Sequence, residues 1–595
     1  MSKMVNLKIN GIDVSVEAGT TILEAAEKLK IKIPVLCYHK DLCIAGNCRV
    51  CVVEVVGSRK LVAACATPVN EGLEILTNSL LVRNARKDII ELLLSEHNAD
   101  CTKCYRNGNC ELQDLAAEYK ITNQDFIDLA HGTYTIDDLS PSIVKDDSRC
   151  IRCQRCVRTC TELQSVGALS VAHKGSEMKI STFFDRNIRE VVCTNCGQCV
   201  IHCPTGALVE KTYIERVWDA IADPTKHVVV QTATAVRIGL GEELELDAGS
   251  RVTGKMVSAL KRLGFDSVLD TDFTADLTIM EEGTELLHRL KANLVEGDTS
   301  EPLPLTTSCS PGWVKFFEHT FPDMLDHMST CKSPQQMFGA LAKTYFAKKI
   351  EVDPENMVSV SIMPCTAKKY EADRPEMRDS GQKDVDYVLT TRELAVMIKQ
   401  AGIQFSDLPE EKYDSIMGQS TGAAVIFGAT GGVMEAALRT AYEIVTGREV
   451  PFENLNITPV RGLEGVREAS VKIENVLPDW KFLEGAELKC CVAHGLANAR
   501  KVMEKVQNKE VEYHFIEIMA CPGGCLGGGG QPIPTNDEIR KKRMDAIYEE
   551  DANMTLRKSH ENPEVVQIYK EFLGEPLGKE SHKLLHTEYF ERQRY

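Results

Sequence analysis

Long apolar runs are missing from this 595-residue chain. No stretch approaches the roughly 20 apolar residues that a membrane-spanning helix needs, and the first 19 residues contain no apolar signal core. We therefore expect a cytoplasmic protein. Basic residues are outnumbered, since 69 Lys and Arg against 87 Asp and Glu give a net charge of −18. This charge argues against nucleic acid or an anionic membrane as a partner.

A dinucleotide-binding motif is also missing. No GxGxxG sequence follows a predicted strand near either end, so no nicotinamide site is expected. The length, with 43% hydrophobic and 26% charged residues, indicates several soluble globular domains.

Cysteine, by contrast, is abundant, with 23 residues. A disulfide framework is not expected in a chain without an export signal. Twenty of these cysteines lie in clusters or in motif-like contexts, which indicates thiolate ligands of metal clusters. The remaining three, Cys43, Cys490 and Cys491, fit no such pattern, and we expect them not to bind metal.

The first cysteine group lies in a predicted domain over residues 1–79. Two alternating runs around Asn10-Gly11 predict a hairpin, and Thr20 or Thr21 is placed to cap a helix behind it. The group has the spacing C-x10-C-x2-C-x13-C and consists of Cys37, Cys48, Cys51 and Cys65. A zinc knuckle is the alternative, but its gaps are shorter. The pattern resembles the [2Fe-2S] ferredoxin domain of the complex I electron-input subunit and of modular iron hydrogenases.

The second group lies in a predicted domain over residues 80–138. It begins with an amphipathic helix, for which we expect an apolar face of Ile89, Leu92 and Leu93. Three cysteines cannot complete a cubane, and a histidine at the helix end is spaced to serve as the fourth ligand. The set is His97, Cys101, Cys104 and Cys110. It resembles the one-histidine, three-cysteine [4Fe-4S] site of the same two families.

The third group lies in a predicted domain over residues 139–215, where a C-x2-C-x2-C-x3-C run occurs twice. This is the two-cluster ferredoxin signature, in which the fourth cysteine of each run binds the other cluster. One predicted [4Fe-4S] set is Cys150, Cys153, Cys156 and Cys203. The other is Cys193, Cys196, Cys199 and Cys160.

Residues 216–535 show a different pattern, in which short Val- and Ile-rich runs alternate with helical stretches. Strands are predicted near 226–232, 358–364 and 386–391, with helices over 275–293, 332–349, 391–402 and 430–447. This alternation predicts an α/β domain with mainly parallel sheets. Cys365 directly follows one predicted strand, at the position where such sheets bind ligands.

The stretch Glu517–Pro532 carries Cys521 and Cys525 among six glycines and two prolines. Glycine has no side chain to bury, so we expect this backbone to press against something that is not protein. A disulfide or a flexible hinge is the alternative.

Three stretches, TSCSPGW at 307–313, MPCTAKKYE at 363–371 and this glycine loop, resemble the signatures of [FeFe]-hydrogenases. The resemblance implies an H-cluster, a [4Fe-4S] cubane joined to a diiron unit with CO, cyanide and a bridging amine dithiolate. It places Cys365, Cys521 and Cys525 on the cubane, with Cys525 also bridging to the diiron unit.

One pair of positions departs from that family. Two adjacent cysteines are expected where this chain has Cys309-Ser310. Either Cys309 relays protons and Ser310, a harder ligand than thiolate, is the fourth cubane ligand, or Cys309 turns in to bind iron. We favour Ser310 at the ligand position.

The resemblance also implies roles for residues around the cluster. Lys368 would hydrogen-bond cyanide, whereas Lys369 is expected at the surface. The expected pocket residues are Ser333, Gln335, Met363, Pro364 and Met519. The expected proton relay is Glu282, Glu285, Arg289 and Ser329, although on sequence alone the two glutamates could equally be solvated helix charges. Cys331 is expected to be a packed thiol.

Residues 536–595 are polar and helical, and they resemble the small-subunit-like tail that wraps the catalytic domain of this family. Taken alone, they would be a peripheral, partly mobile segment. The predicted fold class is thus multidomain α+β and α/β: a β-grasp [2Fe-2S] domain, a one-His/three-Cys domain, a two-[4Fe-4S] ferredoxin domain, and an α/β catalytic domain with a helical tail.

The implied activity is reversible oxidation of H2, with electrons passing through one [2Fe-2S] and three accessory [4Fe-4S] clusters. The resemblance to the complex I subunit implies flavin- and [2Fe-2S]-bearing partner subunits, with NAD(P), ferredoxin or both as acceptors, and electron bifurcation left open. The alternatives are a stand-alone ferredoxin-dependent hydrogenase and an H2-sensing or electron-transfer homologue with low turnover.

Overall fold

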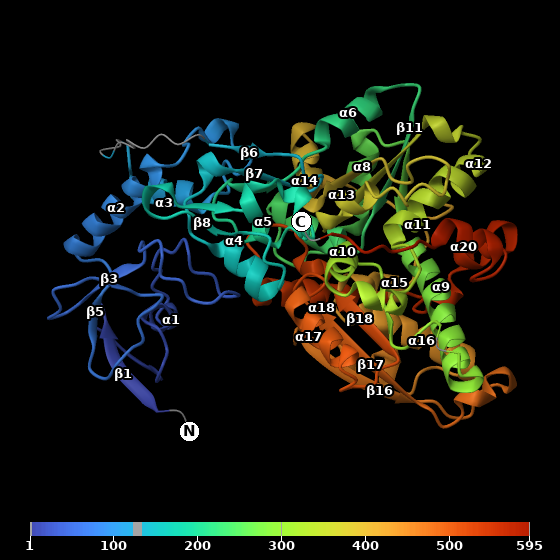
Figure 1. Ribbon diagram of the computed structural model, residues 1–595. Helices are drawn as coiled ribbons and strands as arrows, with labels where there is room; N and C mark the ends of the chain where they lie inside the picture. The colour runs from blue at the N-terminus through green and yellow to red at the C-terminus, as the bar shows by residue number, and fades with distance from the viewer. Residues whose placement is uncertain (1–2, 123–125, 127–133, 299, 594–595) are drawn as a thin grey trace. The chain divides into compact units, whose positions relative to one another are not determined.

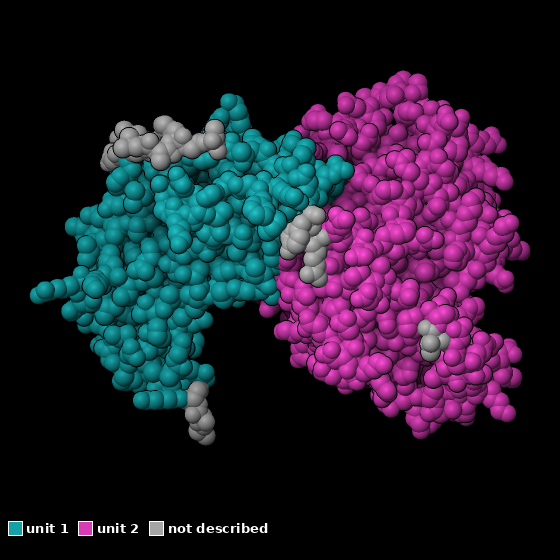
Figure 2. Space-filling view, viewed as in Figure 1, with its two compact units in different colours: residues 1–162, 167–191, 202–209 teal, residues 163–166, 192–201, 210–595 magenta. Residues whose placement is uncertain are grey.

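The computed structural model describes residues 3–122, 126, 134–298 and 300–593, which fall into two compact units (Figures 1 and 2). Unit 1 comprises residues 1–162, 167–191 and 202–209, and unit 2 comprises residues 163–166, 192–201 and 210–595. Four parts of the predicted domains lie outside the described residues: 1–2 of the first domain, 123–125 and 127–133 of the second, 299 of the catalytic domain and 594–595 of the tail. None of the described helices combines the length and the apolar character that crossing a membrane requires.

Unit 1 begins with a five-stranded sheet of order β2-β1-β5-β3-β4. Ile9 pairs with Ile12, which confirms the predicted hairpin turn at Asn10-Gly11. Both turn residues have positive φ, 51° and 80°, as a tight two-residue hairpin loop requires. Helix α1 (Ile22–Lys28) follows, with Thr21 as its N-cap. The strands are β1 (Met4–Ile9), β2 (Ile12–Glu17), β3 (Val52–Val55), β4 (Val62–Ala63) and β5 (Glu74–Leu76).

Helix α2 (Leu80–Ser95) confirms the predicted amphipathic helix, although its buried side differs from the expected one. Val82 and Ile90 are buried, whereas Leu92 is 51% exposed. The prediction of Leu92 on the buried face was wrong because the helix turns Ile90 inward. The remaining elements of unit 1 include α3 (Glu111–Glu118), β6 (Ile136–Asp137), β7 (Ile143–Asp146), α4 (Arg155–Arg158), β8 (Ser170–Ala172) and β9 (Lys179–Ser181).

Unit 2 is built on a four-stranded sheet of order β12-β11-β14-β15, in which every pairing is parallel. Val228 and Val230 belong to one apolar cluster and Val229 to another, so both faces of the sheet are covered. Such double burial explains the continuous Val- and Ile-rich runs in the sequence. The strands are β11 (His227–Thr232), β12 (Ser267–Asp270), β14 (Met357–Met363) and β15 (Tyr387–Thr390).

A second sheet in unit 2 has the order β13-β18-β17-β16, with β16 antiparallel to β17. Its strands are β13 (Leu305–Thr306), β16 (Val466–Lys472), β17 (Glu487–His494) and β18 (Phe515–Met519). Cys490 and Cys491 lie on β17, and burial raises the pKa of both thiols to about 12. They are packed core residues of this sheet.

The predicted long helices of unit 2 are present. They are α9 (Thr271–Lys291), α11 (Pro334–Leu341), α14 (Thr391–Gln400) and α16 (Gly432–Thr446). The stretch predicted as one helix over 332–349 continues after α11 as a π-helical turn at Ala342–Phe346 and then α12 (Ala347–Lys349). The other helices include α6 (Ile214–Ala222), α8 (Thr253–Leu263), α10 (Pro311–Thr320), α13 (Ala367–Ala372) and α17 (Leu496–Gln507).

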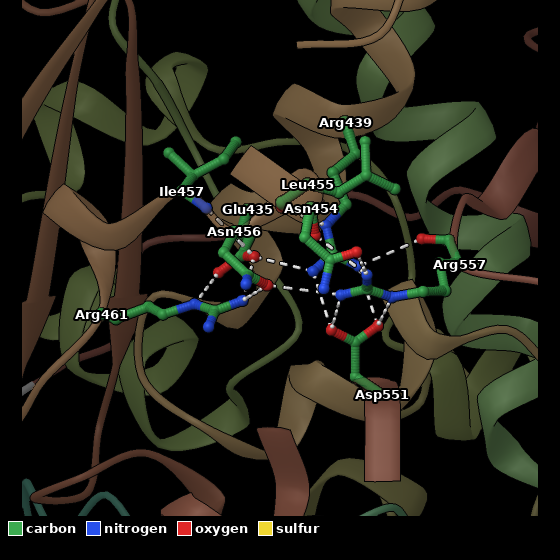
Figure 3. Close-up of polar contacts among 9 residues, drawn as sticks. All are labelled: Glu435, Arg439, Asn454, Leu455, Asn456, Ile457, Arg461, Asp551 and Arg557. Carbon is green, nitrogen blue, oxygen red and sulfur yellow. Dashed lines mark hydrogen bonds and ion pairs between the residues drawn. The ribbon is translucent and has the colours of Figure 1, made fainter. Parts of the chain in front are cut away.

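The C-terminal tail forms α18 (Asp537–Asn553), α19 (Pro563–Ile568) and α20 (Lys579–Leu585). Ile568, Leu584 and Leu585 are buried in an apolar core cluster that also contains residues of α9 and α11. Figure 3 shows a second anchor, in which Asp551 at the end of α18 contacts both Arg439 and Arg557. The tail is therefore an integral layer of unit 2 and not a peripheral segment.

Candidate active site

A cavity lies in unit 2 where β11, β14 and β18 end. Parallel sheets bind ligands at the carboxyl ends of their strands. The cavity brings together cysteines from three distant segments. Among the predicted site residues, its wall includes Cys309, Ser310, Gln335, Met363, Pro364, Cys365, Lys368, Met519, Cys521 and Cys525.

Each cysteine segment reaches the cavity by a strand-to-loop or loop-to-helix turn. Strand β14 ends at Met363, so Cys365 lies between this strand and α13. Strand β18 ends at Met519, two residues before Cys521. Ser310 is the N-cap residue of α10, whose first helical residue is Pro311. A proline at this position is compatible with helix initiation because its missing N–H would have no partner there.

Buried thiols fill one side of this cavity. Burial raises the pKa of Cys365, raises that of Cys525 to about 12 and raises that of Cys521 well above its ordinary value. The charges of neighbouring cysteines add to the shift of Cys521 and Cys525. Thiols packed in this way become thiolates only when a strong cation is present. The donor set and its apolar wall therefore fit an iron–sulfur group.

The glycines of the 517–532 loop contact protein backbone. A Cβ on Gly528 would lie 2.1 Å from the carbonyl oxygen of Pro364, and one on Gly529 would lie 2.4 Å from that of Cys196. Gly524, at φ +81°, is 2.8 Å by the same measure from the Thr430 amide nitrogen. Gly524 and Gly528 also line the cavity, so the expectation that this loop presses against a non-protein group stays a prediction.

Cys309 and Ser310 point to different surroundings. The Ser310 hydroxyl accepts a hydrogen bond of 3.2 Å from the Ala520 amide, directly beside Cys521. Burial raises the pKa of Cys309 well above its ordinary value, and the charge of Glu282 raises it further. Ser310 therefore lies on the side of the cavity cysteines, and Cys309 lies next to Glu282.

Lys368 is held at the cavity wall by an acidic partner that the sequence reading missed. Its ammonium donates to Glu371 Oε2 at 2.9 Å and to the carbonyl of Cys309 at 3.1 Å. The same Glu371 oxygen accepts hydrogen bonds from Ser333 Oγ at 2.9 Å and from Gln335 Nε2 at 3.0 Å. Glu371 thus fixes the position of a buried positive charge at the cavity.

Two expectations about this region need correction. Ser333 is not among the residues that line the cavity, because its hydroxyl turns to Glu371 behind the wall. Lys369 is not at the surface, since it is 2% exposed and pairs with Glu393 at 2.6 Å. Lys369 is thus a buried structural ion pair.

Three of the predicted relay residues, Glu285, Arg289 and Ser329, are linked by hydrogen bonds. Ser329 Oγ donates to Glu285 Oε2 at 2.7 Å, and Arg289 donates to Glu285 Oε1 at 2.7 Å. Glu282 and Glu285 are 2% and 5% exposed, so the alternative of solvated helix charges was wrong. Burial and the charge of Glu285 raise the pKa of Glu282 to about 8. Arg289 is also buried, and it donates to the carbonyls of Pro302 and Asp326.

In unit 1, the first predicted ligand set is also assembled. The sulfur atoms of Cys51 and Cys65 are 3.4 Å apart, and Cys37 hydrogen-bonds to both Cys48 and Cys65. Cys43 lies outside this group, at the exposed surface, where its thiol donates to Glu162 at 2.9 Å.

The one-histidine set lies around Arg149 and the loop at Gly206. Burial and the charge of Arg149 lower the pKa of His97, and Arg149 also contacts Cys104. A Cβ on Gly206 would lie only 2.5 Å from the Cys104 sulfur, so this position leaves room for the thiol and nothing more. The Cys110 sulfur lies 3.6 Å from the carbonyl oxygen of Pro204. These contacts fit the predicted ligand set, which stays a prediction.

One cavity of unit 1 is lined by the predicted set Cys150, Cys153, Cys156 and Cys203. Burial raises the pKa of Cys150 to about 11 and that of Cys153 to about 12. The ligands of the other predicted set belong to different units: Cys193, Cys196 and Cys199 to unit 2, and Cys160 to unit 1. This second set stays a prediction.

Several wall residues were absent from the predicted site. Ala233, Thr234 and Ala235 follow β11, and Asp272 and Phe427 complete that side of the cavity. A usable signal existed for the first group, because 226–232 was predicted as a buried strand and ligands bind beyond the ends of such strands. No comparable signal marks Phe427 or Glu371.

Family profiles match along the whole described architecture. The profile for the iron-only hydrogenase large subunit, C-terminal domain, matches residues 226–529, and that for the iron hydrogenase small subunit matches 537–592. A 2Fe-2S cluster-binding domain matches 2–79, the NADH-ubiquinone oxidoreductase-G iron-sulfur binding region matches 86–125, and the ferredoxin-like domain of NADH-quinone oxidoreductase subunit 3 matches 140–209. The chain belongs to the iron-only, or [FeFe], hydrogenase family and is a hydrogenase.

Individual relatives agree with this assignment. The chain is 53% identical to the NADP-reducing hydrogenase subunit HndD of Solidesulfovibrio fructosivorans, over 99% of this chain and 100% of that protein. It is 40% identical to iron hydrogenase 1 of Clostridium pasteurianum, over 98% and 100% of the two chains. A solved structure of the [FeFe]-hydrogenase HydA1 from Chlamydomonas reinhardtii is 44% identical, with a TM-score of 0.57, and covers 64% of this chain and 99% of its own.

Proposed function

We propose that this chain is the catalytic subunit of a multimeric, NAD(P)-linked [FeFe]-hydrogenase that interconverts H2 with protons and electrons at an H-cluster. The observation that carries the proposal is the meeting of Cys365, Cys521 and Cys525 with the ammonium of Lys368 in one buried, mainly apolar cavity. Such a cavity can hold an inorganic group, exclude bulk water and offer one fixed positive charge.

Four side chains would hold the cubane. Cys365, Cys521 and Cys525 supply thiolates, and Ser310 supplies the fourth donor from its position beside Ala520 and Cys521. Cys525 would also link the cubane to the diiron unit. When bound, the diiron unit supplies the heterolytic cleavage of H2, and the protein supplies ligation, orientation and proton transfer.

Lys368 would hold a cyanide ligand of the diiron unit. Its ammonium already has two protein acceptors, Glu371 Oε2 and the Cys309 carbonyl, which fix its direction. A lysine ammonium has three donor hydrogens, so one remains for a ligand in the cavity. Gln335, Met363, Pro364 and Met519 would complete the wall against which that unit packs.

Protons would enter and leave through Cys309 and Glu282. The pKa of Glu282, raised to about 8 by burial and Glu285, lets this carboxyl hold or release a proton near neutral pH. From Glu282 the path continues through Ser329 and Glu285 to Arg289, whose hydrogen bonds are given above. Arg289 is itself buried, so the path would have to continue past Arg289 before it reaches solvent.

Electrons would travel through four accessory clusters, one [2Fe-2S] and three [4Fe-4S], at the ligand sets described above. The complex I-like profiles over residues 86–125 and 140–209 support a role in passing electrons to other subunits. The NADP-reducing hydrogenase subunit HndD, at 53% identity, supports a nicotinamide nucleotide as the final acceptor. Since the sequence shows no dinucleotide-binding motif, a flavin- and [2Fe-2S]-bearing partner would reduce it, with ferredoxin as a further acceptor.

Infrared spectroscopy of the matured chain tests the central proposal, because bound CO and cyanide absorb where protein does not. We expect these bands together with H2 oxidation and evolution in the wild type, and neither in a Cys365→Ala variant. A matured chain without the bands, or with the bands and no H2 turnover, contradicts the proposal. The second outcome would instead support a sensing or electron-transfer homologue.

Copurification tests the multimer. We expect a flavoprotein and a [2Fe-2S] protein to remain bound to the tagged chain, and the complex to reduce NADP⁺ with H2. A chain that purifies alone and reduces ferredoxin at full rate would favour a stand-alone hydrogenase.

A further inference from the structure

Glu281 is a buried carboxylate next to the proposed relay but with a different set of partners. It is 0% exposed and lies on α9, four residues before Glu285 and therefore on the same helix face. Among the residues that the structure describes, its hydrogen-bonding partners come from the C-terminal tail: the Tyr569 hydroxyl, the Leu577 amide at 2.8 Å and His586 Nε2 at 3.1 Å. The proposed relay through Glu282 uses none of these groups.

His586 connects this carboxylate to the segment that carries Ser329. Its Nδ1 lies 2.8 Å from the hydroxyl of Thr330, while its Nε2 faces Glu281. The backbone fixes this arrangement, since Thr587 N donates to Thr330 O at 2.8 Å and Lys332 N donates to Leu585 O at 2.7 Å. With both ring nitrogens engaged, the imidazole bridges the tail and the 329–332 segment.

His582 extends the chain of titratable groups to the surface. Its ring stacks on that of His586, with the ring centroids 4.7 Å apart and an angle of 5° between the planes. His582 is exposed, whereas His586 is 4% exposed. The tail thus places one imidazole in solvent directly against another that touches a buried carboxylate.

Cys331 lies beside His586 in the backbone and contacts the proposed relay through its side chain. Its thiol donates to Glu285 Oε2 at 3.8 Å, and its backbone bridges to His586. Burial raises the pKa of Cys331 well above its ordinary value, and the charges of Glu285, Glu282 and Glu281 add to this shift. The thiol therefore keeps its proton, and it can pass that proton to Glu285, the carboxylate that it contacts.

We propose that the tail provides a second proton entrance to the active site, running from His582 through His586 and Glu281 to Cys331 and Glu285. A proton from solvent reaches the Thr330 hydroxyl by way of His582 and an intervening water, and the hydroxyl passes its own proton to Nδ1 of His586. His586 Nε2 then passes its proton to Glu281. Glu281 then gives a proton to the Cys331 sulfur as the thiol releases its proton to Glu285. This entrance rests on the proposed function, because it joins the proposed relay at Glu285.

A purely structural role is the competing explanation, in which His586 and Glu281 only fasten the tail. The substitution His586→Gln separates the two. A glutamine amide can donate to Glu281 and accept from Thr330, so it preserves the fastening, but it cannot carry a proton from one end to the other. His560→Gln is the matched control, because His560 is also a tail histidine but contacts Thr440 and Glu443.

The first measurement uses the full chain before insertion of the diiron unit, so it does not depend on turnover. Infrared difference spectra against a Cys331→Ala variant identify the S–H band of Cys331, and its replacement by S–D is timed after mixing with D2O. We expect His586→Gln and Glu281→Gln to slow this exchange by about tenfold, below the usual effect of a proton-transfer group because the Arg289 side stays open. Exchange as fast as in the wild type and in His560→Gln, or faster, overturns the second entrance.

The second measurement uses the matured enzyme and distinguishes the entrance from the relay it joins. We expect His582→Gln to lower H2 evolution at low buffer concentration by about twofold, and added imidazole to restore it, while His560→Gln has no effect. If the His582→Gln rate equals that of the wild type, and Glu282→Gln is inactive, the tail entrance fails and the proposed relay stands. If Glu282→Gln keeps full activity, the relay itself fails, and the exchange data then decide on the tail.

Discussion

The substitution Asp551→Asn is expected to release the C-terminal tail. The Asp551 side chain is 1% exposed and accepts hydrogen bonds from two buried arginines (Figure 3). Arg439 donates to its two oxygens at 3.0 and 2.8 Å, and Arg557 donates to them at 3.0 and 2.7 Å. An asparagine has nearly the same shape but no charge, and its NH2 group faces a guanidinium donor.

The expected free-energy cost of Asp551→Asn depends on which hydrogen-bond acceptors the two arginines retain. Arg439 retains Glu435 at 2.7 Å, and Arg557 retains the Asn454 carbonyl at 2.9 Å. Breaking a buried ion pair on one side typically costs about 3–5 kcal/mol, and these remaining partners place Asp551→Asn at about 3 kcal/mol. At about 1.4 kcal/mol per factor of ten, the population of the released tail should rise about 150-fold.

Limited proteolysis measures this population. When opening and closing are faster than cleavage, the cleavage rate follows the fraction of open tail. We expect cleavage within residues 537–592 to accelerate by the same factor, about 150-fold, in Asp551→Asn. The control is Asp545→Asn on the same helix, whose partner Lys541 is 3.4 Å away and whose side chain is 63% exposed. Equal cleavage rates in the two variants would refute the anchor.

The same anchor has a defined pH dependence. Burial alone would raise the pKa of Asp551, but the hydrogen bonds from Arg439 and Arg557 lower it overall. A carboxyl with a lowered pKa contributes stability above its unfolded-state pKa and loses it as the pH falls through its folded-state value. Acid should therefore loosen the wild-type tail, and Asp551→Asn should lack this part of the acid response.

Three further predictions concern the active site. Burial and Glu285 raise the pKa of Glu282 to about 8, so its contribution to stability is present below its unfolded-state pKa and lost as the pH rises towards 8. Glu282→Gln should reduce the fall in thermal unfolding temperature of the cluster-loaded chain as the pH rises towards 8. An unchanged fall would contradict the raised pKa of Glu282. Ser310→Cys should retain cubane iron longer under a chelator, since thiolate is the softer ligand, and faster iron loss would argue against Ser310 at the ligand position. Lys368→Met should lower H2 turnover by about 100-fold and weaken the CO and cyanide bands, whereas full activity would remove Lys368 from the site.

The parts of the fold and of the site that could be predicted from the sequence are those that a regular spacing of residues marks. Metal ligands that follow one another within a few residues keep their geometry locally, so runs such as Cys150, Cys153 and Cys156 could be inferred without a fold. Strands β11 and β14 were also predictable, because strands buried on both faces carry continuous Val and Ile. Strand β16, VREASVK, alternates charged and small residues at an antiparallel edge, and it has no such run.

Buried polar partners could not be predicted in the same way. Lys368 and Lys369 are adjacent lysines in the sequence, yet one faces the cavity and the other pairs with Glu393. Glu281 and Glu282 are likewise neighbours with different partners, because a helix turns each successive side chain by about 100°. Their roles depend on residues far away in the chain, such as Glu371 and His586.

The contact between Gly529 and Cys196 has a consequence for electron flow. Gly529 touches the Cys196 carbonyl, the Gln198 amide donates to the Gly527 carbonyl at 2.8 Å, and Thr366 donates to the Asn195 carbonyl at 2.7 Å. The loop proposed to carry ferredoxin-type ligands thereby packs backbone to backbone against the loop proposed to carry the cubane ligands. Because tunnelling rates fall exponentially with distance, the missing Cβ at Gly529 would keep the two proposed clusters as close as the backbone allows.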